Sequence, residues 1–158
     1  MSSKAIKPKI SVLFSTDTFI TPFRRNLMDN FEVNWCPIPF TPYPKSFFDF
    51  ITFPYRLILK KLKTFTSSRN SDILFIEFAD ETLALVSKIR KKKMIVSRLH
   101  RYELFKLPNA NWSEVDLVIV VNNWMRQNLE QKVPLLKGKI ITIPNFVDID
   151  YWHKSKNR

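Results

Sequence analysis

The chain has 158 residues, of which 45% are apolar and 14% aromatic, so it can bury the core of one domain and is not a disordered chain. Lys and Arg number 26 against 14 Asp and Glu, a net charge of +12, which points to an anionic partner such as phospholipid, nucleic acid or a phosphorylated substrate. The single cysteine, Cys36, excludes a disulfide framework and a zinc cluster and favours a reducing, cytoplasmic compartment.

Short apolar runs alternate with segments that carry helix signals. After the first run, Thr21 is placed to cap a helix whose first residue is Pro22. Asp80 is expected to cap the helix that follows the third run, and Asn122 or Asn123 the helix that follows the fifth. The six predicted strands span residues 9–15, 31–38, 72–78, 93–97, 116–121 and 139–143.

Strands made of continuous aliphatic residues, separated by helices, indicate a parallel sheet that is covered on both faces. The prediction is therefore a Rossmann-like α/β domain over residues 1–150, with residues 151–158 as a linker or tail. The N-terminal stretch matches neither a signal peptide nor an anchor, and no window of the sequence is apolar enough to span a bilayer.

Polar residues follow the predicted strands at their carboxyl ends, where sheets of this kind bind ligands. The clearest case is IVSRLHRYELF, residues 95–105, in which an apolar run ends abruptly in basic and acidic side chains. Because such residues recur strand after strand, a cleft is a better interpretation than a solvated loop. The candidate cleft residues are Thr16, Asp17, Arg98, His100, Arg101, Glu103, Asn122 and Asn145.

Several chemistries are disfavoured. The only glycine is Gly138, so the chain lacks the glycine-rich turn that lets a pyrophosphate approach backbone amides in dinucleotide-binding and P-loop proteins. The sequence contains no nucleophile elbow. His100 and His153 have no partners at metal-ligand spacing, so no metal is expected.

Four segments in chain order, DILFIEF, VSRLHRYELF, WSEVDLVIVVNNWM and KIITIPNFVDIDYW, resemble the N-terminal half of a GT-B glycosyltransferase, and most closely the retaining family 4 enzymes. In that family an Arg-x-His-x-x-Asp/Glu cluster follows the fourth strand, and the sixth strand ends in Ile-Pro-Asn-Gly-Val-Asp. The resemblance covers residues 10–152. It implies the acceptor-side domain of an enzyme that transfers a sugar from a nucleotide sugar to a glycan or a lipid-linked acceptor.

The resemblance also implies roles for individual residues. His100 corresponds to the cleft histidine of the family and is expected to be catalytic, bound to the donor sugar or its phosphate. Arg98 is expected to pair with phosphate or to hold Glu103, which suits an acceptor hydroxyl or a tie to Arg98. Thr16 and Asp17 are expected beneath the acceptor. Plainer interpretations stay open, with Arg98 and Glu103 as a surface ion pair and His100 as a packed loop residue.

In the family, the segment around Asn145 leads into a linker and a second Rossmann-like domain that carries most of the nucleotide-sugar contacts. This sequence ends at Arg158, so we expect no donor domain within it. Such enzymes work by closing two domains on their substrates, so we expect inactivity without a separate donor-binding domain or subunit. From its residue type, Asn145 is otherwise a turn former.

Residues 46–65, SFFDFITFPYRLILKKLKTF, combine aromatic and basic side chains as an interfacial membrane segment does. Pro54 is expected to divide this segment into two short helices. The alternative is that its phenylalanines simply cover the sheet. The candidate membrane-interface residues are Phe47, Phe48, Phe53, Arg56, Lys60, Lys61 and Lys63, and they predict a protein that is peripheral at the inner face of the cell membrane.

A second class of function stays open beside the half-enzyme. A basic α/β module with no catalytic role would bind anionic lipid or nucleic acid. Nucleic acid is the less favoured ligand of the two, because no RNA- or DNA-binding motif appears and the aromatic residues do not form a stacking platform.

Overall fold

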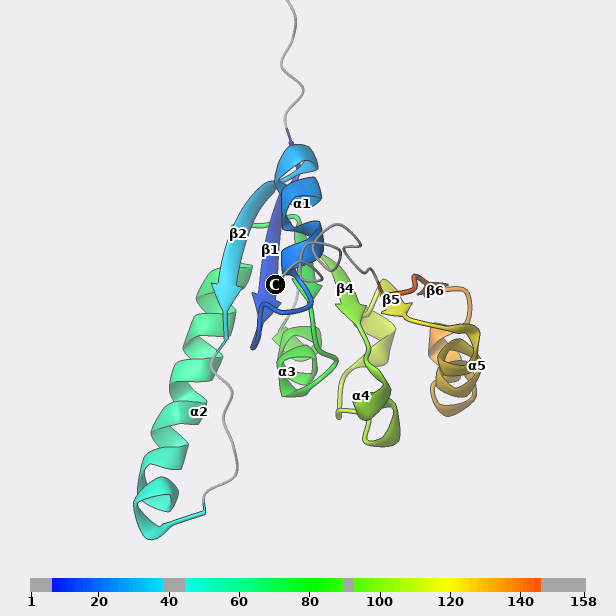
Figure 1. Cartoon of the computed structure of the whole chain (residues 1–158). Helices are drawn as coiled ribbons and strands as arrows, with labels where there is room; N and C mark the ends of the chain where they lie inside the picture. Colours follow the sequence, from blue (N-terminus) through cyan, green and yellow to red (C-terminus); the bar gives the residue numbers. More distant parts are fainter. Residues whose placement is uncertain (1–6, 39–44, 90–92, 146–158) are drawn as a thin grey trace, which may run out of the picture.

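The structure is a computed structural model, and it describes residues 7–38, 45–89 and 93–145. Strands and helices alternate along the chain (Figure 1). In chain order the elements are β1 (Lys9–Phe14), η1 (Thr21–Phe23), α1 (Arg24–Asn30), β2 (Glu32–Pro37), α2 (Phe47–Ser68), β3 (Ile73–Ile76), α3 (Glu81–Ile89), β4 (Met94–Arg98), α4 (Arg101–Phe105), η2 (Trp112–Glu114), β5 (Leu117–Val120), α5 (Asn123–Lys132), η3 (Pro134–Leu136) and β6 (Ile140–Thr142).

The strands of the described chain form one sheet of six strands in the order β2-β1-β3-β4-β5-β6, and every neighbouring pair is parallel. All carboxyl ends therefore meet at one edge, which we call the carboxyl edge; the opposite one is the amino edge. The strand order reverses at β1, since β2 lies on one side of it and β3 on the other. The predicted Rossmann-like α/β fold is confirmed.

Each predicted strand is present, although every strand after β1, including β3 and β5, begins one residue later than predicted. The acidic residues that precede β3 and β5 lie at the amino edge and accept backbone hydrogen bonds there. The Asp72 carboxylate accepts a hydrogen bond from the backbone N–H of Lys9 at 2.9 Å, and the Asp116 carboxylate accepts one from Ile95 at 2.7 Å. These side chains satisfy backbone donors near the starts of the neighbouring strands β1 and β4.

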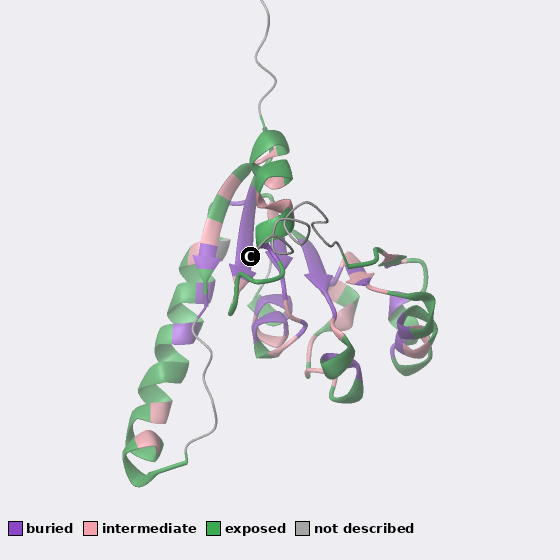
Figure 2. Ribbon diagram, in the orientation of Figure 1, coloured by how far each residue is buried: buried purple, intermediate pink, exposed green. Residues whose placement is uncertain are grey.

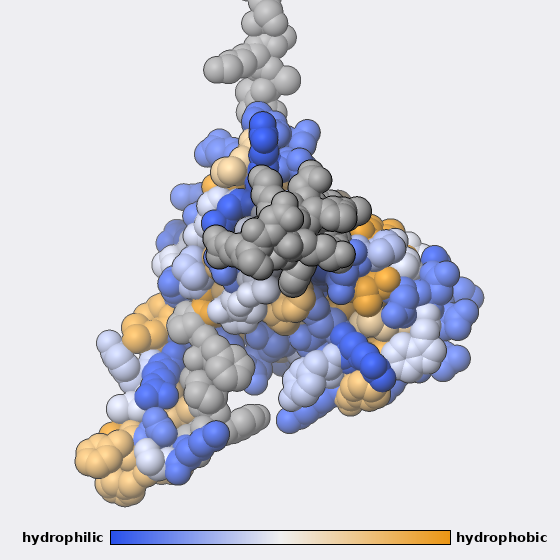
Figure 3. Space-filling model, viewed as in Figure 1, coloured by the Kyte–Doolittle hydropathy of each residue, from blue (hydrophilic) through white to orange (hydrophobic). Residues whose placement is uncertain are grey.

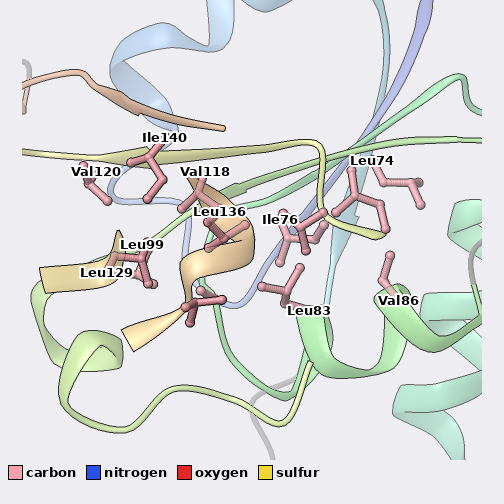
Figure 4. Packing of buried hydrophobic residues seen from close by; sticks show 14 of the residues in the cluster. Leu74, Ile76, Leu83, Val86, Leu99, Val118, Val120, Leu129, Leu136 and Ile140 are labelled. Carbon is pink, nitrogen blue, oxygen red and sulfur yellow. The ribbon is translucent and has the colours of Figure 1, made fainter. Parts of the chain in front are cut away.

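Two apolar clusters cover the two faces of the sheet, as the alternation of side chains along a strand requires. On one face Leu74 and Ile76 pack with residues of α3, α5 and η3 (Figure 4). On the other face Phe75 belongs to a smaller cluster, against which Phe23 and Leu27 of η1 and α1 pack. The helical layers on both faces hold the strands in place.

Two of the predicted helix caps are confirmed and one is wrong. Asp80 accepts a hydrogen bond from the backbone N–H of Thr82 at 2.7 Å, and Asn122 accepts one from that of Met125 at 2.9 Å. Thr21 does not cap a helix. Its hydroxyl instead donates to the carbonyl of Asp17 at 2.9 Å, so this oxygen is committed to the preceding turn.

The prediction that Pro54 divides residues 46–65 into two short helices is wrong, because α2 is one helix of 22 residues with Pro54 inside it. Ser46 caps its start by accepting from the backbone N–H of Asp49 at 3.1 Å. A hydrogen bond between the Ser46 side chain and the Asp49 carboxyl is the largest cause that lowers the pKa of Asp49. Proline removes the hydrogen bond to the carbonyl four residues earlier. Phe50 and Pro54 are both exposed, so solvent can satisfy that carbonyl.

The burial of α2 is inverted relative to an ordinary surface helix. Lys60 and Thr64 are its buried residues, and the carbonyl of Ser67 accepts a hydrogen bond from the Ser11 hydroxyl at 2.7 Å. The opposite side is apolar and faces solvent. We call it the outer face of α2, and it comprises Phe47, Ile51, Tyr55, Ile58, Leu62 and Phe65. Figure 2 shows most of α2 as exposed, and Figure 3 shows apolar side chains gathered at its first turns.

This packing makes a prediction about stability. Leu83, fully buried in the larger cluster, should cost about 2–5 kcal/mol of the free energy of unfolding when replaced by alanine, because the change leaves a cavity. Leu62 is 55% exposed, and Leu62→Ala should change that free energy by less than about 0.5 kcal/mol. Urea unfolding of both variants checks this, and equal losses would contradict an outward-facing Leu62.

Candidate functional site

The candidate site lies at the carboxyl edge, where β3 and β4 end beside each other. Ile76 and Ser97 are paired in the sheet register, so the next residues, Glu77 and Arg98, are brought side by side. His100 follows two residues later and immediately precedes α4. We call Glu77, Arg98, His100 and Asn145 the edge network, because hydrogen bonds connect them.

Glu77 is the centre of the edge network and is fully buried. One of its carboxylate oxygens, Oε1, accepts from a terminal nitrogen of Arg98 at 3.2 Å, and the same nitrogen lies 3.4 Å from the carbonyl oxygen of Phe19. The other terminal nitrogen of Arg98 donates to the side-chain oxygen of Asn145 at 2.8 Å. The second carboxylate oxygen of Glu77 has no hydrogen-bond partner within the described part of the chain.

His100 lies against the same carboxylate. Its Nε2 is 3.2 Å from the carbonyl oxygen of Glu77 and 3.3 Å from Oε1 of that residue. The imidazole ring stacks on Phe78 with centroids 4.6 Å apart and tilts against Phe19 at 4.8 Å. The ring is therefore held by two aromatic neighbours and one carboxylate, with 14% of the side chain left exposed.

Glu103 does not pair with Arg98. The prediction that Arg98 holds Glu103 in the cleft is therefore wrong, and so is the prediction that the two form a surface ion pair. Glu103 is buried, and its carboxylate accepts a hydrogen bond from the backbone N–H of His100. This contact caps the N-terminus of α4. His100 is the N-cap residue, and Glu103, three residues later, satisfies its free backbone N–H. Burial raises the pKa of Glu103 above its ordinary value. Arg98 is 9% exposed and pairs with Glu77.

The remaining candidate cleft residues are exposed and lie around the edge network. Thr16 is within 3.2 Å of the Thr18 hydroxyl, and the carboxylate of Asp17 is 3.8 Å from Arg24. Arg101 is the first residue of α4, and Asn122 is committed to capping α5. Asn145 is the one that the structure joins directly to Arg98, so it does more than form a turn.

A small open hollow lies at the carboxyl ends of β1 and β3, where the strand order reverses. Open α/β sheets bind ligands at such reversal points. Phe78 lines this hollow and also stacks on His100, so the hollow adjoins the edge network. The hollow itself measures only about 10 Å³, room for about one water molecule and far less than an ordinary ligand pocket of roughly 300 Å³. Its lining residues are Leu13, Phe14, Ser15, Ile76, Phe78, Asp80 and Thr82.

Glu77 was absent from the residues singled out as site candidates. A signal for it existed in DILFIEF, where an acidic residue follows a continuous apolar run. Buried acids of this kind need a partner. The partner is on the neighbouring strand rather than nearby in the sequence, 21 residues away, so the strand order is needed to find it.

The predicted membrane-interface residues divide into two groups. Phe47 and Phe48 are 75% and 79% exposed, so the alternative that the phenylalanines simply cover the sheet is wrong for these two. Lys61, Lys63 and Arg56 are exposed and Phe53 is half-buried. The prediction that Lys60 lies at the membrane interface is wrong. Lys60 is 6% exposed, and its Nζ lies 3.2 Å from the Glu81 carboxylate. It faces the domain because its position on the helix points toward α3.

In the described ranges, no group of three or more His, Cys, Asp or Glu residues is arranged to hold a metal ion. Likewise, no helix among the described residues is both long enough and apolar enough to cross a membrane. Comparison of the chain with protein-family models, with curated proteins and with solved structures finds no match.

The edge network predicts a strong effect of one substitution. Glu77→Gln removes the charge that balances the buried Arg98 guanidinium and should lower the free energy of unfolding by about 3 kcal/mol. The control is Glu130→Gln, which breaks an i,i+4 pair with Arg126 whose side chains are 27% and 45% exposed; it should cost under about 0.5 kcal/mol. Chemical denaturation measures both, and similar small losses would show that the network is not holding the edge.

The raised pKa of Glu103 makes a prediction about pH. The folded protein keeps a proton on this carboxyl at pH values where the unfolded chain has already lost it, so the stability from this group falls as pH rises above the ordinary value of 4.5. Glu103→Gln carries no such proton. The free energy of unfolding of the wild type relative to this variant should therefore decrease from pH 4.5 upward until the raised pKa is passed, as followed by urea unfolding at a series of pH values. A relative increase over that range would contradict the assignment.

Proposed function

We propose that the domain is the acceptor-side half of a glycosyltransferase, which transfers a sugar from a nucleotide sugar to a glycan or a lipid-linked acceptor. The observation that carries the proposal is the edge network beside the reversal point of a parallel sheet. It gathers the RLHRYE residues where ligands bind in folds of this kind. The order of the four quoted sequence segments supports the same conclusion.

The groups at the carboxyl edge suit a sugar. A sugar ring has apolar C–H faces and a rim of hydroxyl groups, so it needs an aromatic surface beside a few hydrogen-bonding groups. Phe19 is 39% exposed and touches His100, whose side chain is partly exposed. The hydroxyl groups of Thr16 and Thr18 lie on the loop that leads to Phe19. Together they form one wall of an acceptor site.

Arg98 fits an acceptor-side role better than phosphate binding. Its guanidinium already donates to Glu77 and Asn145, and Glu77 neutralises its charge. An arginine that recognises phosphate offers its forked donors to the ligand. Arg98 therefore acts as a positioning residue that holds Glu77, and through it His100, in place. Contacts to the donor phosphates then come from a donor-binding domain or subunit.

A half-site of this type needs closure. Transfer from a nucleotide sugar develops charge on the departing phosphate, and catalysis requires donor and acceptor to be aligned and water to be excluded. In this proposal His100 contacts the donor sugar or its phosphate only when a donor-binding domain closes over the carboxyl edge. A lipid-linked acceptor would require the domain to work as a peripheral protein at the inner face of the cell membrane.

The test is a titration of the isotope-labelled 158-residue protein with saccharide acceptors and with UDP- and GDP-sugars, followed by NMR. We expect weak binding of saccharide, with shifted signals at Thr16, Phe19 and His100, and little response to nucleotide sugars. His100→Ala should reduce the saccharide shifts, and Glu130→Gln should leave them unchanged. Saccharide shifts confined to the amino edge, or no saccharide response at all, would overturn the acceptor-side assignment.

The same protein is expected to transfer no sugar by itself, because its described residues form one domain and the donor site is supplied elsewhere. Release of UDP or GDP in the presence of acceptor measures transfer directly. Turnover by the isolated 158-residue protein would show that the half-enzyme proposal is wrong, even if the acceptor binds as expected.

A further inference from the structure

We propose that α2 is an interfacial helix, which lies with its outer face in an anionic membrane and brings the carboxyl edge to an acceptor anchored in that membrane. The choice of acceptor class rests on the proposed function. The docking itself does not, since it depends only on the surface of α2.

The first observation is the inverted burial of α2. A surface helix of a water-soluble protein normally turns its apolar stripe inward. Here the inward positions are Lys60, Thr64 and Ser67, while the outer face turns large apolar side chains to solvent. The exposed fractions on the outer face are 75% for Phe47, 58% for Ile51, 64% for Tyr55, 54% for Ile58, 55% for Leu62 and 47% for Phe65.

The inversion is fixed by polar contacts on the inward side. Lys60 pairs with Glu81 at the start of α3, and the Ser67 carbonyl accepts from Ser11 of β1. A rotation of α2 about its axis would bury the outer face but would break these contacts and expose the paired groups. The apolar stripe therefore stays outward and stays available to a partner.

The second observation is the charge that flanks this stripe. Lys61 and Lys63 are exposed, and the period of the helix places them on the two flanks of the apolar outer face. Arg56 is also exposed but pairs with Asp49 at 3.2 Å. In an interfacial helix, long basic side chains reach up to the lipid phosphates while the apolar face enters the acyl boundary. The net charge of +12 adds a longer-range attraction to an anionic surface. These features together select an anionic membrane as the occupant.

The geometry of docking follows from the fold. α2 returns the chain from β2 to the start of β3, so it runs opposite to the strands and its first turns lie at the carboxyl edge (Figure 1). No residue from 47 to 59 is buried, so this half of α2 extends along the interface beyond the domain (Figure 2). With α2 flat on the membrane, the carboxyl edge opens beside the lipid headgroups. A lipid-linked saccharide is the acceptor class that such a site reaches.

The experiment is sedimentation of the 158-residue protein with vesicles. We expect binding to vesicles that contain phosphatidylglycerol at low salt, partial release as salt rises, and little binding to vesicles of phosphatidylcholine alone. The double variant Lys61→Gln with Lys63→Gln should weaken binding roughly tenfold or more, because each basic residue near the surface contributes to the attraction. The matched control is Lys132→Gln with Lys137→Gln, two exposed lysines near the amino edge, which should change it little.

A matched pair of variants tests the contribution of the apolar outer face to membrane binding. Leu62→Asp should abolish binding, whereas Leu135→Asp should leave it intact, since Leu135 is 65% exposed but lies in η3, away from α2. Circular dichroism and thermal unfolding check that both variants fold. Equal losses in the two lysine pairs, or unchanged binding by Leu62→Asp, would overturn the proposal in favour of diffuse charge. Absence of binding to anionic vesicles would overturn it outright.

Orientation is tested with an environment-sensitive fluorophore on single cysteines in a Cys36→Ala background. Labels at Ile58→Cys and Leu62→Cys should shift to the blue on vesicles, and a label at Met94→Cys, exposed at the amino edge, should not. A response at Met94 with none on α2 would exclude this docking face. A self-associating protein whose dimer is broken by Leu62→Asp, with no vesicle binding, would assign the outer face to a second copy instead. Because these assays contain no sugar, their failure would leave the proposed sugar transfer untouched.

Discussion

The buried contact between Glu77 and Arg98 is the interaction on which the carboxyl edge depends. A fully buried carboxylate is costly unless a cation and further hydrogen bonds compensate it. Arg98 supplies the cation, and its other donors reach the carbonyl of Phe19 after β1 and the side chain of Asn145 after β6. The buried Glu77 carboxylate and its Arg98 partner thereby connect the chain at the ends of four strands, β1, β3, β4 and β6, and they also contact His100 before α4.

The parallel sheet makes this arrangement possible. β1, β3 and β4 are neighbours, although α2 and α3 separate them in sequence. Since all three strands end at the same edge, Glu77 and Arg98 meet side by side, and the short loop after β1 brings Phe19 against them. Rigid strands hold the polar groups on one side, and Phe19 and Phe78 pack the imidazole of His100 on the others. The edge is thus preorganised, as a site for a specific ligand must be.

The same domain carries a surface that its own fold does not use. In α2, Lys60 and Thr64 are buried, whereas the apolar outer face is exposed to solvent. Contiguous exposed apolar patches on a protein surface usually mark sites of interaction with another protein or a membrane. The inverted burial is therefore consistent with the membrane proposal. The first turns of α2 lie at the carboxyl edge, where the acceptor site is proposed.

The sequence by itself determined the fold class, because hydrophobic runs, turn residues and caps are local and each reports on its own element. The six strands, the caps at Asp80 and Asn122 and the gathering of RLHRYE at one edge all followed from it. Only the tertiary structure decided which charges meet. Arg98 pairs with Glu77 rather than Glu103, and Lys60 turns inward to Glu81, since strand order and helix rotation are set by packing across the whole domain. Pro54 stays within one helix because its surroundings are solvent, which no local propensity reveals.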